Sequence, residues 1–309
     1  MRIATQNTYE RGLATLQQRQ SELATLQAQL SSGKRVQRAS DDPAAAARAE
    51  RALATQLRAA ADQRALDASR NVVAQAENAL GDAGELLQQV REAMVGAGNP
   101  SYSDAERQGL ACVIRGLREQ LLAIANRGDG ADAYLFGGQG SDRPPFVDAP
   151  GGVAWRGSSG QSVNAQTEAM PLALDGRAVW LQAPNAVDGA PDQSTFALLD
   201  RLATELETRG RDPAAIAASV ADGLRDVDAG MNHLLSQRAR LGETLNRSDS
   251  VELRLSEQAL SAQAQRSAAE DLDLVQAVSE FQNRQSGYDA ALKAYAMVQR
   301  MSLFNYLGS

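Results

Sequence analysis

LSSGKRVQRASDDPAAAARAE, residues 30–50, ends one helical pattern and begins another. Gly33 follows an apolar-periodic segment, and glycine most readily adopts the left-handed conformation that closes a helix. Asp42 can cap the next helix through its carboxylate, and Pro43 suits a first helical position because no amide hydrogen is needed there. The stretch therefore predicts a helix that stops at Gly33, a short connection, and a second helix that starts at Pro43.

Three apolar seams with coiled-coil spacing follow along the chain. The first lies behind Pro43, the second behind a capping box of Ser103 and Glu106, and the third behind the cap Asp212-Pro213. Their members are Leu66, Val73, Ala76, Leu80, Ala83, Leu87, Val90, Met94 and Ala97; Leu110, Ile114, Leu117, Leu121 and Ile124; and Val220, Leu224, Val227, Met231, Leu234, Leu241 and Leu245. Because no proline occurs from 214 to 309, one continuous helix could span the C-terminal part.

Composition favours helices and argues against several function classes. Aromatic residues make up only 4% of the chain, so the apolar residues are mainly those of long helices. The net charge of -7 argues against general nucleic-acid binding. No apolar run approaches the roughly 18 residues of a membrane span, and the N-terminus lacks the apolar core of a cleavable signal peptide. We therefore expect no nucleic-acid partner, no membrane insertion and no export by the common cleaved route.

The character of the sequence changes between residues 129 and 193. Six of the nine prolines and both tryptophans lie there, among glycine-rich turns. Short runs such as AYLF (133–136), GVAW (152–155), SVNAQT (162–167) and AVWL (178–181) predict strands. We expect a small β-rich domain inserted between helical segments, with Trp155 and Trp180 in its core rather than in an exposed adhesive patch.

Both chain ends carry apolar stripes at helical spacing. The members are Tyr9, Leu13, Leu16, Leu23, Leu26 and Leu30 near the N-terminus, and Leu274, Val278, Phe281, Tyr288, Leu292, Tyr295, Leu303 and Phe304 near the C-terminus. Either the two stripes form an internal helix pair, or they form a surface that joins other subunits. Periodicity alone does not decide between these interpretations.

Residues that could carry chemistry are few. The single histidine, His233, lies beside the third seam without partners at the spacing of a metal site or a triad. Cys112 lies among apolar residues and is expected in the core. The acidic residues of EDLD (270–273) read as a solvated helix face, and GGQGS (137–141) lacks the ending of a phosphate-binding loop. We expect no catalytic, cofactor-binding or metal site, and therefore a protein that is not an enzyme.

Both ends of the chain resemble the flagellin-like axial proteins of bacteria. Residues 1–50 resemble the N-terminal signature of that family, in which LSSGKRV…SDDPA is the most specific element. LLAIANRGDGADAYLFGGQGSDRPPF (121–146) is similar to the segment where the second rod helix gives way to the outer domain. RARLGETLNR (238–247) and residues 267–307 are similar to the C-terminal arm, whereas the middle insert matches no member in detail.

Within this family, the opening MRIATQNTY and the ending MSLFNYL resemble the hook-filament junction branch. The resemblance implies a structural adaptor that assembles by coupled folding of its terminal helices. Its implied partners are further copies of itself in a ring, the neighbouring hook-associated protein, flagellin, and an export chaperone on the C-terminal arm. Its implied location is the extracellular bacterial flagellum, reached through type III export without a cleaved signal. A short flagellin, or an adhesin or enzyme displayed on a flagellin-like scaffold, remain the alternatives.

The expected fold class is mainly α, an elongated coiled-coil or helical-bundle rod built from both chain ends with the small β-rich domain in the middle. By resemblance, residues 1–42 and 265–309 are the arms of an inner coiled-coil domain, and the two terminal stripes are its assembly interface. Residues 43–130 and 194–264 are the rod helices, and 131–193 the outer insert. The residues of the spoke between inner and outer tube layers are Gly33, Lys34, Arg35, Arg38, Asp42 and Pro43. Its three basic residues either pair with acids of neighbouring subunits or are solvated.

Overall fold

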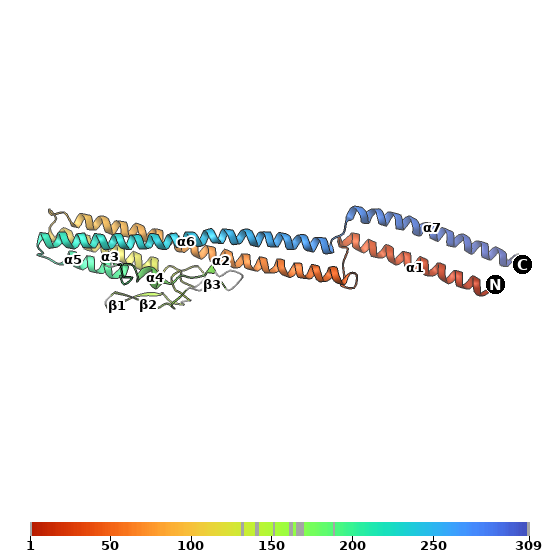
Figure 1. Ribbon diagram of the computed structural model, residues 1–309, viewed down its shortest axis with the longest axis horizontal. Coiled ribbons are helices and arrows are strands. Elements are labelled where there is room, and N and C mark those ends of the chain that lie inside the picture. The colour runs from red at the N-terminus through yellow and green to blue at the C-terminus, as the bar shows by residue number, and fades with distance from the viewer. Residues whose placement is uncertain are drawn as a thin grey trace. The chain divides into compact units, whose positions relative to one another are not determined.

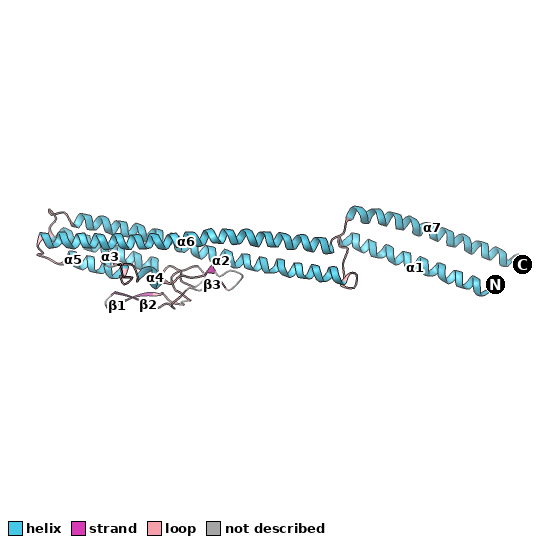
Figure 2. Ribbon diagram, viewed as in Figure 1, coloured by secondary structure: helices cyan, strands magenta, loops and turns pink. Residues whose placement is uncertain are grey.

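The fold is mainly helical, as predicted (Figures 1 and 2). The computed structural model describes residues 2–130, 133–139, 142–150, 152–160, 163–164, 170–187 and 189–307, and the side chains at 2–9, 163–164 and 299–307 are outside that description. The helices are α1 (Arg2–Ser32), α2 (Pro43–Ala97), α3 (Asp104–Ala125), α4 (Gly176–Trp180), α5 (Thr195–Glu207), α6 (Pro213–Glu270) and α7 (Leu274–Leu307). The strands are β1 (Phe146–Ala149), β2 (Gly152–Trp155), β3 (Val163–Asn164) and β4 (Met170–Pro171).

The predicted helix starts are confirmed. The Asp42 carboxylate accepts a hydrogen bond from the amide of Ala45 at 2.9 Å, and α2 begins at Pro43. Ser103 and Glu106 form the capping box of α3, in which the Ser103 amide donates to the Glu106 carboxylate at 2.7 Å. These bonds satisfy amide groups that a helix leaves without partners in its first turn.

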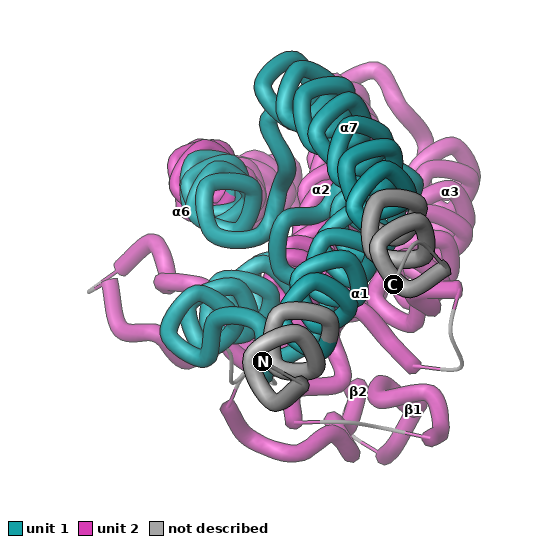
Figure 3. The backbone as a smooth tube through the Cα atoms, turned by 90° about the vertical axis from the view of Figure 1, so that its right-hand side faces the viewer, with its two compact units in different colours: residues 1–59, 256–309 teal, residues 60–255 magenta. Residues whose placement is uncertain are grey.

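The chain divides into two compact units (Figure 3). Unit 1 comprises residues 1–59 and 256–309, and unit 2 comprises residues 60–255. The helices α2 and α6 contribute residues to both units. The five segments predicted from the sequence have other boundaries than these two units, because α2 and α6 each cross from one unit into the other.

Unit 2 contains a bundle of helices around one apolar core. All nine members of the first seam are buried, eight of them in this core and Leu66 in a smaller cluster. The other two seams contribute Ile114, Leu117, Leu121, Val220, Val227, Leu234 and Leu241 to the main core. The core also includes Phe196, Leu199 and Leu202 from α5. The seam predictions are thus confirmed, because residues at coiled-coil spacing share one helix face and that face is the buried one.

Ion pairs cross between α2 and α6 within unit 2. Arg238, the polar residue in the third seam, pairs with Glu77 at 2.6 Å, and Arg91 pairs with Asp228 at 2.8 Å. Since these side chains are partly exposed, each pair fixes the register of the two helices more than it stabilises them.

The described part of the insert contains less sheet than the sequence predicts. GVAW forms β2, which pairs antiparallel with β1, and β3 pairs antiparallel with β4. The strand prediction for AVWL is wrong: residues 176–180 form α4, because Asp175 caps a helical turn by accepting from the Arg177 amide at 3.0 Å. The strand prediction for AYLF is also wrong, since Tyr134 makes only an isolated bridge with Gly128.

The insert is not separate from the bundle core. Phe136, Phe146 and Trp180 are fully buried and belong to the same apolar cluster as the helices of unit 2. The Phe136 ring meets the Trp180 ring edge-on at 5.3 Å, and Trp180 lies 6.2 Å from the ring of Phe196 in α5. Trp180 is therefore a core residue, as expected, whereas Trp155 is only half-buried.

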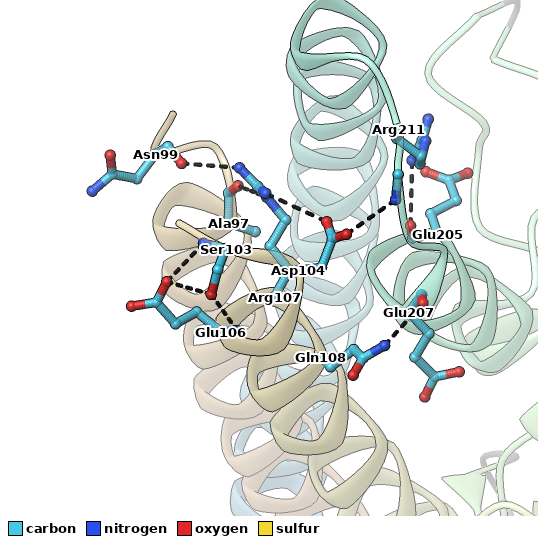
Figure 4. Close-up of polar contacts among 11 residues, drawn as sticks. Ala97, Asn99, Ser103, Asp104, Glu106, Arg107, Gln108, Glu205, Glu207 and Arg211 are labelled. Carbon is cyan, nitrogen blue, oxygen red and sulfur yellow. Dashed lines mark hydrogen bonds and ion pairs between the residues drawn. The ribbon is translucent and has the colours of Figure 1, made fainter. Parts of the chain in front are cut away.

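One end of the bundle is closed by polar contacts between two turns (Figure 4). The guanidinium of Arg107, which is almost buried, donates to the carbonyls of Ala97 at 3.3 Å and Asn99 at 3.2 Å. Ala97 is the last residue of α2, where the carbonyl groups of a helix lack partners within it, and Asn99 lies in the turn that follows, where its carbonyl also accepts from the Tyr102 amide at 3.1 Å. At the same end of the bundle, the Gly210 amide donates to the carboxylate of Asp104 at 3.0 Å. This bond joins the first residue of α3 to the turn before α6.

Cys112 is exposed, so its predicted place in the core is wrong. The buried face of α3 is formed by residues such as Ala111, Ile114 and Leu121. Cys112 and the exposed Val113 lie on the other side of the helix, because successive residues are rotated by about 100°. Apolar neighbours in sequence therefore misled the prediction for Cys112.

Candidate assembly interface

The two terminal helices pack against each other in unit 1, so part of each predicted stripe is covered. On α1, Leu16 and Leu26 are buried, Leu23 and Leu30 are half-buried, and Leu13 is 46% exposed. On α7, the half-buried stripe residues are Phe281, Tyr288 and Tyr295, and the exposed ones are Leu274, Val278 and Leu292. The side chains of Tyr9, Leu303 and Phe304 lie outside the described residues, although their backbone belongs to α1 and α7.

The middle of the α1–α7 pair is polar. The Arg19 guanidinium donates to the Gly287 carbonyl at 2.9 Å, and Arg284 forms an ion pair with Glu22 at 2.9 Å. Gly12 lies close to the Tyr295 ring, since an added Cβ would be 3.2 Å from Cε2. Exposed ion pairs contribute little to stability, so the α1–α7 pair depends mainly on its few buried apolar residues.

The exposed apolar surface of α7 is larger than the predicted stripe. Val275 is 84% exposed, Met297 59% and Val298 61%, and none of the three was among the predicted interface residues. They were missed because they lie outside the narrow predicted stripe, Val275 and Met297 on one side of it and Val298 on the other, since successive helical residues are rotated by about 100°. We name the exposed set Leu274, Val275, Val278, Leu292, Met297 and Val298 the α7 apolar surface.

The connection between α1 and α2 pairs with the connection between α6 and α7. Gly33 has a φ of 70°, and its amide donates to the Gln29 carbonyl at 2.8 Å, which closes α1. The Gly33 carbonyl accepts from the Leu272 amide at 3.0 Å, and the Arg35 amide donates to the Glu270 carbonyl at 2.7 Å. The spoke is therefore held by backbone hydrogen bonds to a segment far away in sequence.

Two of the three basic spoke residues are paired inside the chain. Lys34 forms an ion pair with Glu270 at 3.1 Å, and Arg35 pairs with Asp42 at 3.3 Å while also donating to the Ala269 carbonyl at 2.8 Å. Neither is free for an acid of a neighbouring subunit in this conformation. In the part of the chain that the structure describes, the Arg38 guanidinium has no such ion pair.

The carboxylates of the spoke cap backbone amides. Asp41 accepts from the amides of Arg38 at 2.8 Å and Gln37 at 3.1 Å, and these bonds hold the pKa of Asp41 below its usual value. The Ala45 amide, and then Arg35, lower the pKa of Asp42 in the same way. Both carboxylates are thus held ionised, and they fix the backbone of the turn into α2.

The C-terminal part, which could have formed one continuous helix because it contains no proline, is interrupted at residues 271–273. Asp273 accepts from the amides of Val275 at 3.0 Å and Gln276 at 3.1 Å, so it caps α7 rather than lying on a helix face. The reading of EDLD as a solvated helix face is therefore wrong. The break follows the predicted arm boundary at 264/265 by several residues, because the bonds to Gly33 and Arg35 decide its position.

The described residues contain neither a membrane-spanning helix nor a metal-binding cluster. Within them, no helix is both long and apolar enough to cross a membrane. Among the same residues, no group of three His, Cys, Asp or Glu side chains is placed to hold a metal ion. His233, the single histidine, instead contacts the Ala178 carbonyl at 3.0 Å and so links α6 to α4.

Two regions of the chain match the sequence patterns of known protein families. The bacterial flagellin N-terminal helical region matches residues 3–141, and the bacterial flagellin C-terminal helical region matches residues 224–307. The first contains α1, α2, α3 and the spoke, and the second contains most of α6 and α7. The elements that form the candidate interface thus lie in the matched regions.

The chain is similar in sequence to two named bacterial proteins and in fold to a solved structure. Flagellar hook-associated protein 3 of Salmonella typhimurium is 32% identical, covering 98% of this chain and 99% of that protein. Flagellin of Bacillus subtilis is 28% identical over 82% of this chain and 81% of its own length. The flagellar junction protein FlgL of Legionella pneumophila shares the fold, with a TM-score of 0.56 at 19% identity over 61% of this chain and 94% of that one. The chain therefore belongs to the flagellar hook-associated protein 3 family, a branch of the flagellin-like axial proteins.

Proposed function

We propose that the chain is a non-enzymatic structural adaptor between the hook and the filament of the bacterial flagellum. The relationship to hook-associated protein 3 extends over nearly the whole of both chains, which favours this role over that of a flagellin. A solved relative is described as a flagellar junction protein, which agrees with the same role.

The α7 apolar surface is the observation that carries the proposed mechanism. Its members are between 40% and 84% exposed although α7 is already paired with α1. Large apolar side chains that a chain leaves exposed in groups are typical of a site that joins another protein, and here Leu274, Val275 and Val278 form one group near the start of α7 and Leu292, Met297 and Val298 form a second near its end. In this proposal, α1 and α7 of neighbouring subunits cover one another, and copies of the chain form a ring.

The proposed assembly couples folding to binding. Since the middle of the α1–α7 pair is polar, few apolar contacts offset the entropy of ordering these helices within one chain. Burial of the α7 apolar surface against neighbours would supply the missing stabilisation. Before assembly, the same surface would be the site for an export chaperone, and α1 would carry an uncleaved type III export signal.

Deletion of the gene in its own host tests the proposed role. Electron microscopy should show hooks without filaments, and immunoblots of the medium should show soluble flagellin. If flagellin is absent from the medium together with the filaments, the chain is itself a short flagellin. Intact filaments after the deletion would contradict both roles and would favour an adhesin or an enzyme displayed on the scaffold.

A pair of variants tests the proposed interface. Val275→Asp with Val278→Asp should reduce incorporation at the hook end at least about tenfold, because charges would be buried between subunits. The monomer melting temperature should stay unchanged, since both valines are exposed. Gln276→Asp with Ser279→Asp is the matched control, with the same charge change on exposed residues of the same turns. Equal incorporation of both variants would show that this surface is not an interface.

A further inference from the structure

Unit 2 contains a groove that no part of the proposed assembly mechanism uses. It lies between the segment 171–179 of the insert and residues 237–247 of α6, and its volume is about 230 Å³. Its apolar lining includes Leu80 of α2, Leu174 and Leu241, which are all buried. The groove is therefore a depression with an apolar floor rather than a gap between polar loops.

The wall formed by the insert is fixed to the bundle. Met170 is buried against Leu66, Val251 and Leu255, and the buried Ser69 hydroxyl donates to the Pro171 carbonyl at 2.5 Å. These contacts seat β4 between α2 and α6 without closing the groove beside it. A rigid wall lowers the entropy cost of binding, because the site does not have to be ordered by its ligand.

The rim on α6 carries two arginines, Arg240 and Arg247, which lie two turns apart and hence on one side of the helix. Both are exposed, and the contact of Arg247 is with the Met170 sulfur at 3.8 Å, a weak acceptor. Across the described part of the chain, neither guanidinium has a carboxylate partner. Arg238 and Arg91, in contrast, are both paired across the bundle.

The acid in the groove, Asp175, forms no ion pair with Arg240 or Arg247 among the described residues. Asp175 uses its carboxylate oxygens on the backbone amides of Arg177 and Gly160, each at 3.0 Å. Gln237 and Thr244 are the neutral polar residues of the lining. The groove thus presents two unpaired guanidinium groups above an apolar floor, which matches a ligand with a carboxylate next to an apolar group.

We propose that this groove receives an acidic and apolar segment of a neighbouring flagellar subunit, an inference that rests on the proposed function. The volume is below the roughly 300 Å³ at which sites for small molecules begin, so it suits one or two side chains of a protein segment. An Asp or Glu of the segment pairs with Arg240 and Arg247, and the adjacent apolar side chain covers Leu174 and Leu241.

Photocrosslinking in assembled flagella tests this proposal. A photoreactive phenylalanine analogue replaces Gln237 or, in a second variant, Thr244, and the control position is the exposed Ser236, which does not line the groove. A product that joins this chain to another chain at 237 or 244, but not at 236, is the expected result. No such product from flagella that contain the chain would overturn the groove proposal and leave the proposed function standing.

Charge reversal tests the role of the arginines. Arg240→Glu with Arg247→Glu should lower the crosslink yield at least about tenfold, whereas lysine at both positions should retain most of it. Arg58→Glu with Arg64→Glu has the same effect on net charge at exposed positions of α2 and should leave the yield unchanged. Equal yields in both reversal variants, or a crosslink within a single chain, for example to the segment around Glu168, would overturn the proposal. Absence of the chain from flagella would overturn this proposal and the proposed function together.

Discussion

At the scale of single residues, long polar side chains complete the helix ends of this protein. Arg107 donates from α3 to the Ala97 carbonyl at the end of α2 and to the Asn99 carbonyl in the turn that follows, a role that neither its position nor its neighbours in sequence reveal. Glu106, one residue earlier, serves the start of its own helix through the capping box. A local motif can be read from the sequence, whereas a cap supplied by another helix depends on how the helices meet.

Replacing Arg107 by Met should lower the free energy of unfolding by about 1–3 kcal/mol, because the carbonyl of the buried Ala97 at the end of α2 would lose this donor while most of the packing remains. Chemical denaturation of the full chain measures this difference. Arg225→Met is the control, since Arg225 is exposed and pairs only with Asp222 in its own helix. A change of similar size in both variants would contradict a capping role for Arg107.

The protein should be less stable in acid, because two carboxylates have lowered pKa values in the folded state. The Ser103 amide holds the pKa of Glu106 below its ordinary value of 4.5, and the Arg115 guanidinium does the same for Glu207. A lowered folded-state pKa contributes stability above the unfolded pKa, and that contribution is lost as pH falls through the folded pKa. The melting temperature should therefore decrease as pH falls below about 4.5, and Glu106→Gln with Glu207→Gln should flatten this decrease. An unchanged slope in the double variant would exclude these two groups as its cause.

At the scale of elements, the connections decide where helices stop. Gly33 closes α1 in a left-handed conformation, and the adjacent backbone bonds to residues 270–272 set the end of α6. Gly33 allowed the end of α1 to be predicted from the sequence, whereas no glycine or proline marks the end of α6. The α6–α7 break therefore depends on partners from the spoke as well as on its own cap, Asp273.

Gly33→Ala should destabilise the chain by about 1 kcal/mol, because alanine at positive φ is strained even though no atom lies within 4 Å of the added Cβ. Gly109→Ala is the control, since it also meets no atom within 4 Å but lies inside α3, where alanine should stabilise by up to about 1 kcal/mol. Opposite signs in thermal unfolding are the expected outcome. Stabilisation by both substitutions would show that the spoke adapts to the new residue.

At the scale of the whole molecule, the apolar core is confined to part of the chain. The main cluster draws all of its buried members from residues 72–241, and it combines bundle helices with the insert. The insert therefore contributes to the stability of the bundle instead of being carried on it as an independent module.

Removing residues 1–32 together with all residues after Ala268 should leave the bundle folded and abolish incorporation into flagella. Far-UV circular dichroism should lose only the signal of α1 and α7, and the melting temperature should shift by no more than a few degrees because the main core keeps all its members. Loss of cooperative unfolding in the truncated chain would show that the terminal helices are needed for the bundle.

The sequence by itself determined the helix starts at Pro43, Asp104 and Pro213 and the buried faces of α2, α3 and α6. These features depend on residues within one or two turns of each other, so local chemistry and periodicity suffice. Only the tertiary structure decided the break after Glu270, the internal pairing of Lys34, and the arginine-rimmed groove beside the insert. Each of these depends on groups that are distant in the sequence, whose meeting is set by how the chain folds back on itself and not by any local preference.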